Sequence, residues 1–239
     1  MGSKNYSVTD FFSEFPPKFW FHDGSFLQGN EYVKFNEDIL DYPKDEIEVW
    51  DWAGVNLNKE SEGFVNINNT SIQYFCIEKL IQQDYDLIYN DDNSGEISDI
   101  VAIKNNENEI HIDLFHLKFA TRGVVSSEIK NFYEVCGQAQ KSLVWKYKEN
   151  TEFFNHLIKR EDKKQKQGQT RIRKGDIDLL EKLLFEAKWN KKLAFHITIV
   201  QPGFSRLTAT APILNLLGVT ANHLKKEGGI NLRVIGSGT

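Results

Sequence analysis

The sequence predicts an α/β protein in which helices flank a mixed β-sheet, with a small β-rich N-terminal lead-in. Apolar residues recur every three or four positions between 129 and 143, which is typical of one face of a helix. Apolar and polar residues instead alternate between 110 and 119, as in a strand with one buried face. The resulting order is helix, three strands, helix and strand, and this mixture is typical of an α/β sandwich.

The first quarter of the chain favours strands. Residues 19–35 have the pattern of a hairpin with glycine turns, and residues 47–58 form a further strand region. We therefore expect a β-rich lead-in over 1–65 and one principal domain over 66–239, a division that suits a chain of 239 residues. The aromatic residues of the lead-in are expected to pack rather than to bind a ligand: Phe19, Trp20, Phe21, Trp50 and Trp52.

The principal domain opens with a helix and then changes to strands. Thr70 or Ser71 can cap a helix over 72–83. A short strand over 85–89 and an acidic turn lead to two strands, 99–104 and 109–119, which a polar turn joins. Further helices are expected over 126–147, 151–158, 175–189 and 210–229, and strands over 192–203, closed by Pro202-Gly203, and 230–237.

The composition argues against a membrane protein or a secreted one. No apolar run approaches the length of a membrane span, and the N-terminus lacks the layout of a signal peptide. Cys76 and Cys136 fall in helix-like segments without metal-ligand spacing. These features favour a reduced, cytoplasmic protein with buried thiols and no membrane contact.

The strand over 110–119 changes character along its length. One of its faces is apolar for three positions and then polar at His116 and Lys118. Since a half-buried strand keeps its apolar side toward the core, the change indicates a polar pocket at the end of the sheet. His116 and Lys118 are expected to reach into that pocket.

Asp99 on the preceding strand is expected to meet His116 and Lys118. A hairpin that pairs Ile103 or Lys104 with Ile110 places Asp99 across from residues 114–116. A carboxylate and an imidazole can hold a divalent cation, and a nearby ammonium can position an attacking water, as cleavage of a phosphodiester requires. The alternative is a charged triad that only forms surface ion pairs, worth at most about 1 kcal/mol.

These residues resemble the PD-(D/E)xK nuclease superfamily, which has the restriction-endonuclease-like fold. The similarity covers residues 70–146 and the strand at 193–201. The blocks DDNSGEISDIVAI, FHLKFA, YEVCGQAQKSLVW and IVQPGFS resemble, more specifically, the nuclease-like region found with bacterial antiphage defence helicases. The resemblance implies bound Mg²⁺ and an activated water. It matches Asp99 to the first acid, His116 to the position before x-Lys, and Lys118 to the lysine.

His116 departs from the pattern, which has Asp or Glu at this position. Imidazole suits Mn²⁺ better than Mg²⁺, so the expected cofactor is Mg²⁺ or Mn²⁺. The metal ligands are then Asp99 with His116, or Asp99 with a second carboxylate. Glu96 and Glu78 are better placed to supply that carboxylate than Asp113, which lies on the opposite face of its strand.

Two polar residues of the following helix join the candidate site. Glu134, Gln138, Lys141 and Trp145 form a stripe beside the apolar face. The resemblance makes Gln138 and Lys141 catalytic groups near the scissile phosphate, whereas the alternative is a solvated helix flank. Gln73, near a helix start, is open to both interpretations.

Residues 159–175 are rich in Lys and Arg and are expected to contact phosphates. This basic strip contains only two acidic residues, Glu161 and Asp162. The equal alternative is a solvated, disordered loop, because Gln, Lys and Gly dominate the segment. The expected nucleic-acid contacts are Lys163, Lys164, Lys166, Arg171 and Arg173.

These features together predict a metal-dependent endonuclease that hydrolyses DNA, with RNA as the alternative, and the resemblance implies that it is the nuclease module of a bacterial antiphage defence system. The expected partners are the nucleic acid and a helicase or other defence protein, in the same chain or a separate one. A homodimer is left open. The rival functions are a catalytically degenerate domain that binds nucleic acid or docks a helicase, and an adaptor with no nucleic-acid role.

Overall fold

A seven-stranded mixed β-sheet forms the centre of the protein. The computed structural model describes residues 7–14, 17–21, 25–34, 40–126 and 128–238. The strand order is β4-β10-β9-β7-β6-β5-β8, and a separate sheet has the order β1-β2-β3. The predicted α/β class, with helices around a mixed sheet and strands near the N-terminus, is confirmed. No helix among the described residues is long and apolar enough to cross a membrane.

The direction of the strands changes in the middle of the large sheet. β7 is parallel to β9, and β10 is parallel to both β9 and β4. β6 is antiparallel to β7 and β5, and β5 is antiparallel to β8. The strands are β4 (Glu48–Val49), β5 (Leu87–Asn90), β6 (Ile100–Asn105), β7 (Glu109–Leu117), β8 (Ile172–Lys174), β9 (Lys192–Ser205) and β10 (Leu232–Ser237).

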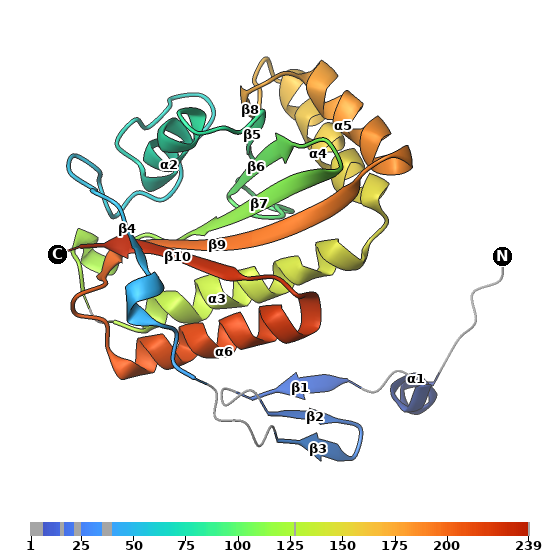
Figure 1. Ribbon diagram of the computed structural model, residues 1–239, viewed down its shortest axis with the longest axis vertical. Helices are drawn as coiled ribbons and strands as arrows, with labels where there is room; N and C mark the ends of the chain where they lie inside the picture. The colour runs from blue at the N-terminus through green and yellow to red at the C-terminus, as the bar shows by residue number, and fades with distance from the viewer. Residues whose placement is uncertain (1–6, 15–16, 22–24, 35–39, 127, 239) are drawn as a thin grey trace.

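Helices cover both faces of this sheet. α2 lies on one side, and α3 and α6 lie on the other (Figure 1). Phe115 of β7 belongs to the core on the α2 side, whereas its neighbour Leu114 belongs to the core that α3 to α6 cover. The helices are α1 (Val8–Glu14), α2 (Ile72–Ile81), α3 (Lys130–Ser142), α4 (Asn150–Gln165), α5 (Ile177–Trp189) and α6 (Ala211–Gly228).

Local sequence signals set several helix ends. Ser71, rather than Thr70, caps α2, because its Oγ accepts a hydrogen bond of 3.1 Å from the backbone N–H of Tyr74. Asp176 caps α5 in the same way. α6 ends at Gly229, whose φ of 59° lies in the left-handed region that favours glycine.

The hairpin of β6 and β7 confirms the predicted antiparallel pair. Ile110 pairs with Asn105 rather than with Ile103 or Lys104, so the register differs from the prediction by one or two residues. Asp99 lies just before β6, and its N–H donates a hydrogen bond of 3.0 Å to the carbonyl of Phe115. Asp99 is therefore at the end of β7, as expected.

The predicted lead-in over 1–65 divides into two parts. β1 (Lys18–Trp20), β2 (Phe26–Gln28) and β3 (Glu31–Val33) form the separate sheet, whereas β4 pairs with β10 in the large sheet. Trp50 and Trp52 are buried in the core beside α2, so both pack as expected. The predicted glycine turn near 24 lies outside the described residues.

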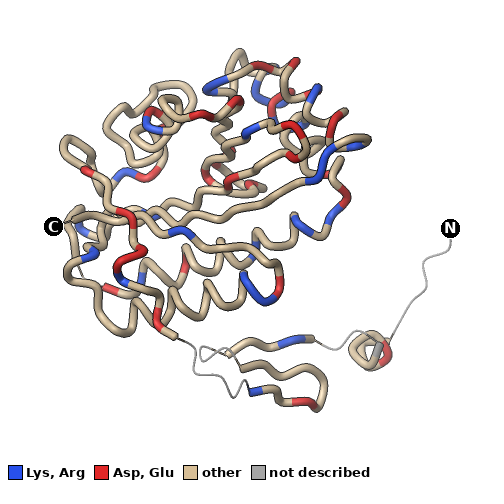
Figure 2. The backbone as a smooth tube through the Cα atoms, in the orientation of Figure 1, with Lys and Arg blue, Asp and Glu red and all other residues tan. Residues whose placement is uncertain are grey.

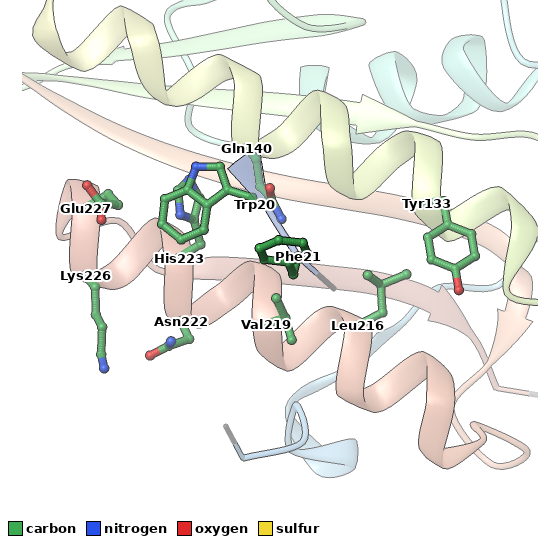
Figure 3. A pocket seen from close by; sticks show the side chains of 10 residues that line it. All are labelled: Trp20, Phe21, Tyr133, Gln140, Leu216, Val219, Asn222, His223, Lys226 and Glu227. Carbon is green, nitrogen blue, oxygen red and sulfur yellow. The ribbon is translucent and has the colours of Figure 1, made fainter. Parts of the chain in front are cut away.

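The small sheet meets the rest of the protein at α6. The ring of Trp20 lies 5.1 Å from that of His223, and Phe21 points into the same space (Figure 3). A cavity of about 230 Å³ lies between these aromatic residues and the helices α3 and α6. Trp20 is nonetheless 42% exposed and Phe19 56% exposed, so the predicted packing of these aromatic residues is incomplete.

The sequence also predicts the form of the basic strip, the end of the strand over 192–203 and the state of the two cysteines. The basic strip is only partly a loop: α4 continues through Gln165, and residues 172–174 form β8, so that the loop is limited to 166–171. β9 continues past Pro202-Gly203 to Ser205, because Ser205 pairs with Ser237 of β10. Cys76 and Cys136 are free and buried, as predicted.

Candidate active site

Asp99 is a buried carboxylate at the end of the β6–β7 hairpin. Its side chain continues the strand pairing, because Oδ2 accepts a hydrogen bond of 2.8 Å from the N–H of Leu117. The residue is only 6% exposed. Burial raises the pKa of Asp99 well above its ordinary value. The hydrogen bond from the N–H of Leu117 acts to lower this pKa, whereas the charges of Glu96 and Glu60 raise it further.

Asp92 and Glu96 bring two more carboxylates to Asp99. One oxygen from each of the three lies within 4.8 Å of the others. Burial and the charge of Asp92 raise the pKa of Glu96. Asp92 and Glu96 stand on the loop between β5 and β6, which the sequence shows as an acidic turn. We call these three residues the carboxylate cluster.

Lys118 follows β7 and lies among acidic side chains. Its Nζ is 2.8 Å from Oε1 of Glu134 and 3.6 Å from Oε2 of Glu60, and its side chain is 9% exposed. Burial acts to lower the pKa of Lys118, but the hydrogen bond to Glu134 and the charge of Glu60 outweigh it, so the pKa is raised. Lys118 is therefore a hydrogen-bond donor and a fixed positive charge rather than a base.

Glu60 connects Lys118 to the carboxylate cluster. Its Oε2 accepts a hydrogen bond of 2.8 Å from the N–H of Phe119, which fixes the carboxylate beside the end of β7. Burial raises the pKa of Glu60, and its negative charge acts on both Asp99 and Glu96. The predicted convergence of Asp99 and Lys118 thus runs through a carboxylate that sequence reasoning missed.

His116 lies near the site but outside the carboxylate cluster. The side chain is fully buried, and its Nε2 is 2.9 Å from the hydroxyl of Ser142 on α3. The same hydroxyl donates to the carbonyl of Ile97 at 2.8 Å. The predicted metal ligand therefore has a different role here, since it joins β7 to α3 and to the loop that precedes Asp99.

The buried imidazole of His116 is expected to make stability depend on pH. Burial lowers the pKa of His116 to about 3 from 6.5. Between these values the unfolded chain takes up a proton that the folded chain does not. The stability due to the neutral imidazole is therefore full above 6.5 and is lost as the pH falls through this window, at up to about 1.4 kcal/mol per pH unit.

Urea unfolding of the wild type and of His116→Gln, at about pH 7 and about pH 5, measures this effect. The stability difference in favour of the wild type should shrink at the lower pH. Nearby acids with raised pKa values act in the opposite direction, but both proteins share them. An equal difference at both pH values contradicts a buried, neutral His116.

Gln138 and Lys141 lie where the stripe on α3 predicted them. Together with Glu96 and His116 they line a cavity of about 110 Å³. Oε1 of Gln138 is buried, and it has no hydrogen-bond partner among the described residues. The structure therefore brings both side chains to the flank of the carboxylate cluster, whereas Glu134 of the same stripe binds Lys118.

Glu78 and Gln73 have other partners. Glu78 lies 3.7 Å from Arg173, and its side chain is 45% exposed. The structure does not bring it to the carboxylate cluster, because α2 directs this residue toward β8. Gln73 is buried, and its Nε2 donates to the backbone carbonyl of Asp99 at 3.0 Å. Gln73 thus supports the position of Asp99 without lining the site.

The side chains of the basic strip range from buried to exposed. Arg171 is 6% exposed and donates to the carbonyls of Asn90 and Asp92, and Arg173 pairs with Glu62. Lys and Arg of α4 and β8 lie among acidic residues in Figure 2. The guanidinium of Arg171 therefore faces the interior, and not the surface where the predicted contact with nucleic acid would lie. Lys163 and Lys166 are exposed. The Nζ atom of Lys164 lies 3.9 Å from the ring centre of Phe64.

Comparisons with known proteins do not identify a family for this chain. No family model, no curated protein and no solved structure matches it. The likeness to PD-(D/E)xK nucleases consequently rests on the sequence blocks alone.

Proposed function

We propose that the protein is a divalent-metal-dependent nuclease that hydrolyses phosphodiester bonds of DNA, with RNA as the alternative substrate. One observation carries the proposal. Asp92, Glu96 and Asp99 lie together without an ion pair to any Lys or Arg among the described residues. A divalent cation would offset the repulsion between these carboxylates, because no Lys or Arg among the described residues is paired with them.

The donor set suits the proposed cofactor. Carboxylate oxygens are the ligands that Mg²⁺ and Mn²⁺ prefer, so Asp99, Asp92 and Glu96 fit either ion. When bound, the ion would lower the pKa of a water and neutralise charge on a phosphate. His116 is not required as a ligand in this arrangement, which removes the preference for Mn²⁺ that an imidazole would impose.

Lys118 and its neighbours complete the proposed chemistry. The ammonium of Lys118 stays protonated beside Glu60 and Glu134, so it can donate to an oxygen that gains negative charge in the transition state. Gln138 and Lys141 flank the carboxylate cluster and can contact the phosphate or its neighbours. The resemblance to nuclease-like regions of antiphage defence helicases supports a role as the nuclease module of such a system, with a helicase as partner.

A cleavage assay tests the proposal. Supercoiled plasmid, linear duplex, single-stranded DNA and RNA are incubated with the protein in Mg²⁺, in Mn²⁺ and in EDTA. We expect cleavage of at least one substrate with either metal and none in EDTA. Absence of cleavage on all four substrates with both metals contradicts the proposal.

A catalytically silent binding domain is the second candidate. The observation that favours it is His116, which stands where the nuclease pattern has an acid and is committed to Ser142. In that case, the protein cleaves none of the substrates, but it binds nucleic acid or a helicase in a separate binding assay. Metal-dependent cleavage that Asp99→Asn abolishes rules this candidate out.

Nucleic-acid binding should depend on salt through the exposed lysines at the C-terminal end of α4 and just after it. We expect replacement of Lys163 and Lys166 by Gln to lower the slope of log Kd against log salt by roughly 0.7 to 0.9 for each phosphate that a lysine no longer neutralises. Affinity should fall similarly for all sequences, because phosphate contacts carry no base information. Fluorescence anisotropy at several salt concentrations measures both effects.

The matched control for this prediction removes the same charge from α5, through Lys182→Gln and Lys188→Gln. That protein should keep the wild-type slope. Equal slopes in all three proteins would show that Lys163 and Lys166 belong to an ordinary solvated surface.

A further inference from the structure

The loop between β5 and β6 is wrapped around one guanidinium group. Arg160 of α4 donates from Nη2 to the backbone carbonyls of Asp91 (2.6 Å), Asn93 (3.1 Å) and Asp92 (3.2 Å), and from Nη1 to that of Ser94 (2.9 Å). Its Nε forms an ion pair with the carboxylate of Asp91. Arg160 is 9% exposed, so these bonds form in a largely dry environment. Four successive backbone carbonyls of the loop thus accept hydrogen bonds from one side chain.

Arg171 and Gly95 reinforce this arrangement. Nη1 of Arg171 donates to the carbonyls of Asn90 (3.0 Å) and Asp92 (2.9 Å). Gly95 has a φ of 87°, and a Cβ there would lie 3.1 Å from Nη1 of Arg160. Glycine therefore allows both the left-handed turn and the close approach of the guanidinium.

The loop is also bonded through most of its own N–H groups, so its shape is fixed before any ligand binds. Carbonyls point inward to the two arginines, and amides bond to side chains and carbonyls of the same loop. These bonds run from Asp92 N to Asn90 Oδ1 (3.1 Å), Asn93 N to Asp92 Oδ1 (2.7 Å), Glu96 N to Asn93 O (3.1 Å) and Ile97 N to Asp91 Oδ2 (2.7 Å).

We infer that Arg160 is a positioning residue that holds Asp92 and Glu96 in place to bind a divalent cation together with Asp99. This inference rests on the proposed function. Asp92 and Glu96 belong to the loop that Arg160 organises, whereas Asp99 is fixed independently by Leu117 of β7. A lysine cannot replace the arginine, because the planar guanidinium offers five N–H donors in a fork and an ammonium is a single point.

The charge of Arg160 and its positioning role predict opposite effects on metal affinity. If Arg160 acted only as a nearby positive charge, its removal would make the carboxylate cluster more negative and tighten cation binding. If Arg160 positions the loop, its removal separates Asp92 and Glu96 from Asp99 and weakens binding. The sign of the change in Kd therefore distinguishes the two roles.

Calorimetric titration with Mn²⁺ tests the inference on the full chain. Arg160→Gln and Arg160→Lys should each weaken Mn²⁺ binding by about 10- to 100-fold, as loss of an outer-shell partner does. Lys159→Gln removes the same charge one residue away on α4, from an exposed position, and should bind like the wild type. Circular dichroism and urea unfolding establish that the compared variants are folded.

Each outcome of the titration decides a different point. Unchanged or tighter binding by both Arg160 variants overturns the positioning role and leaves the proposed function intact. A wild type without saturable Mn²⁺ binding overturns the proposed function and the positioning role together. Weaker binding by Arg160→Lys, in which the charge is retained, supports the geometric role specifically.

Hydrogen exchange on the unaltered protein keeps the inference testable if the Arg160 variants do not fold. In EDTA, the amides of Asp92, Asn93, Glu96 and Ile97 should exchange at least about 100-fold more slowly than in an unstructured peptide. Fast exchange in EDTA that becomes slow only after Mn²⁺ is added means that the ion, rather than Arg160, orders the loop, and this result overturns the inference.

Discussion

Asp99→Asn is expected to abolish metal-dependent cleavage and to stabilise the fold. Asparagine can still accept the hydrogen bond from Leu117, so the end of the hairpin keeps its geometry. It cannot contribute a charged ligand, and the loss of activity should exceed the roughly 10- to 100-fold that an outer-shell change costs. Burial among other carboxylates raises the pKa of Asp99, so its ionised form weakens the fold at neutral pH, and the amide removes that cost.

Cleavage rates and thermal unfolding with and without Mn²⁺ measure both effects. In the wild type, an ion at about 100 times its Kd adds about 2.7 kcal/mol to stability, and the variant should lose most of this gain. Asp113→Asn is the matched control, because Asp113 lies on the opposite face of β7, where it accepts a hydrogen bond from Tyr85. Wild-type cleavage by Asp99→Asn would remove Asp99 from the site.

Lys118→Met is expected to lower the cleavage rate by about 100- to 1000-fold while metal binding is retained. That magnitude is typical of losing one donor to the charge that develops in a transition state. Methionine fills a similar volume but leaves Glu60 and Glu134 without their shared cation. The site then becomes more negative, so Mn²⁺ should bind as tightly as before or more tightly.

Single-turnover cleavage and calorimetric titration separate the two effects. The control is Lys104→Met on β6, which removes a surface ion pair with Asp84 and should cleave normally. Loss of Mn²⁺ binding in Lys118→Met would contradict the assignment, since it would mean that Lys118 shapes the carboxylate cluster rather than acts on the substrate.

The β6–β7 hairpin was predictable because its signal is local. Alternation along β7 assigns Leu114 and Phe115 to opposite faces, and the same rule puts His116 on the face of Leu114, where the structure has Ser142 of α3. The register was off by one or two residues, because alternation fixes which face a side chain takes but not where the turn closes. Asn106 donates to Glu109 at 3.0 Å, which makes the turn tighter than the sequence indicated.

The missing parts of the site depend on contacts between distant segments. No sequence pattern marks Glu60 as a site residue. It lies beside Lys118 only because of the course that the chain takes before α2. Charge counting over 159–175 also could not separate Arg160 and Arg171, which bind carbonyls of the β5–β6 loop, from the exposed Lys163. The carbonyls that bind these two arginines lie about 70 to 80 residues away from them in sequence.

The predicted lead-in over 1–65 contains a strand that belongs to the large sheet. The segment that contains β4 has the same strand-rich pattern as the residues before it. However, β4 pairs with Ile235 and Gly236, which lie at the other end of the chain. Composition changes mark boundaries only where the neighbouring segments do not share a sheet. Pairing between residues so far apart leaves no periodic trace in either segment.

The large sheet ends in very short strands at both edges. β4 has two residues and β8 has three. Each edge therefore offers few free main-chain groups, and a peptide or second copy of the chain gains little by adding a strand there. A partner that bound the described residues would consequently contact side chains, either on the helices or on the small sheet that carries the exposed Phe19 and Tyr32.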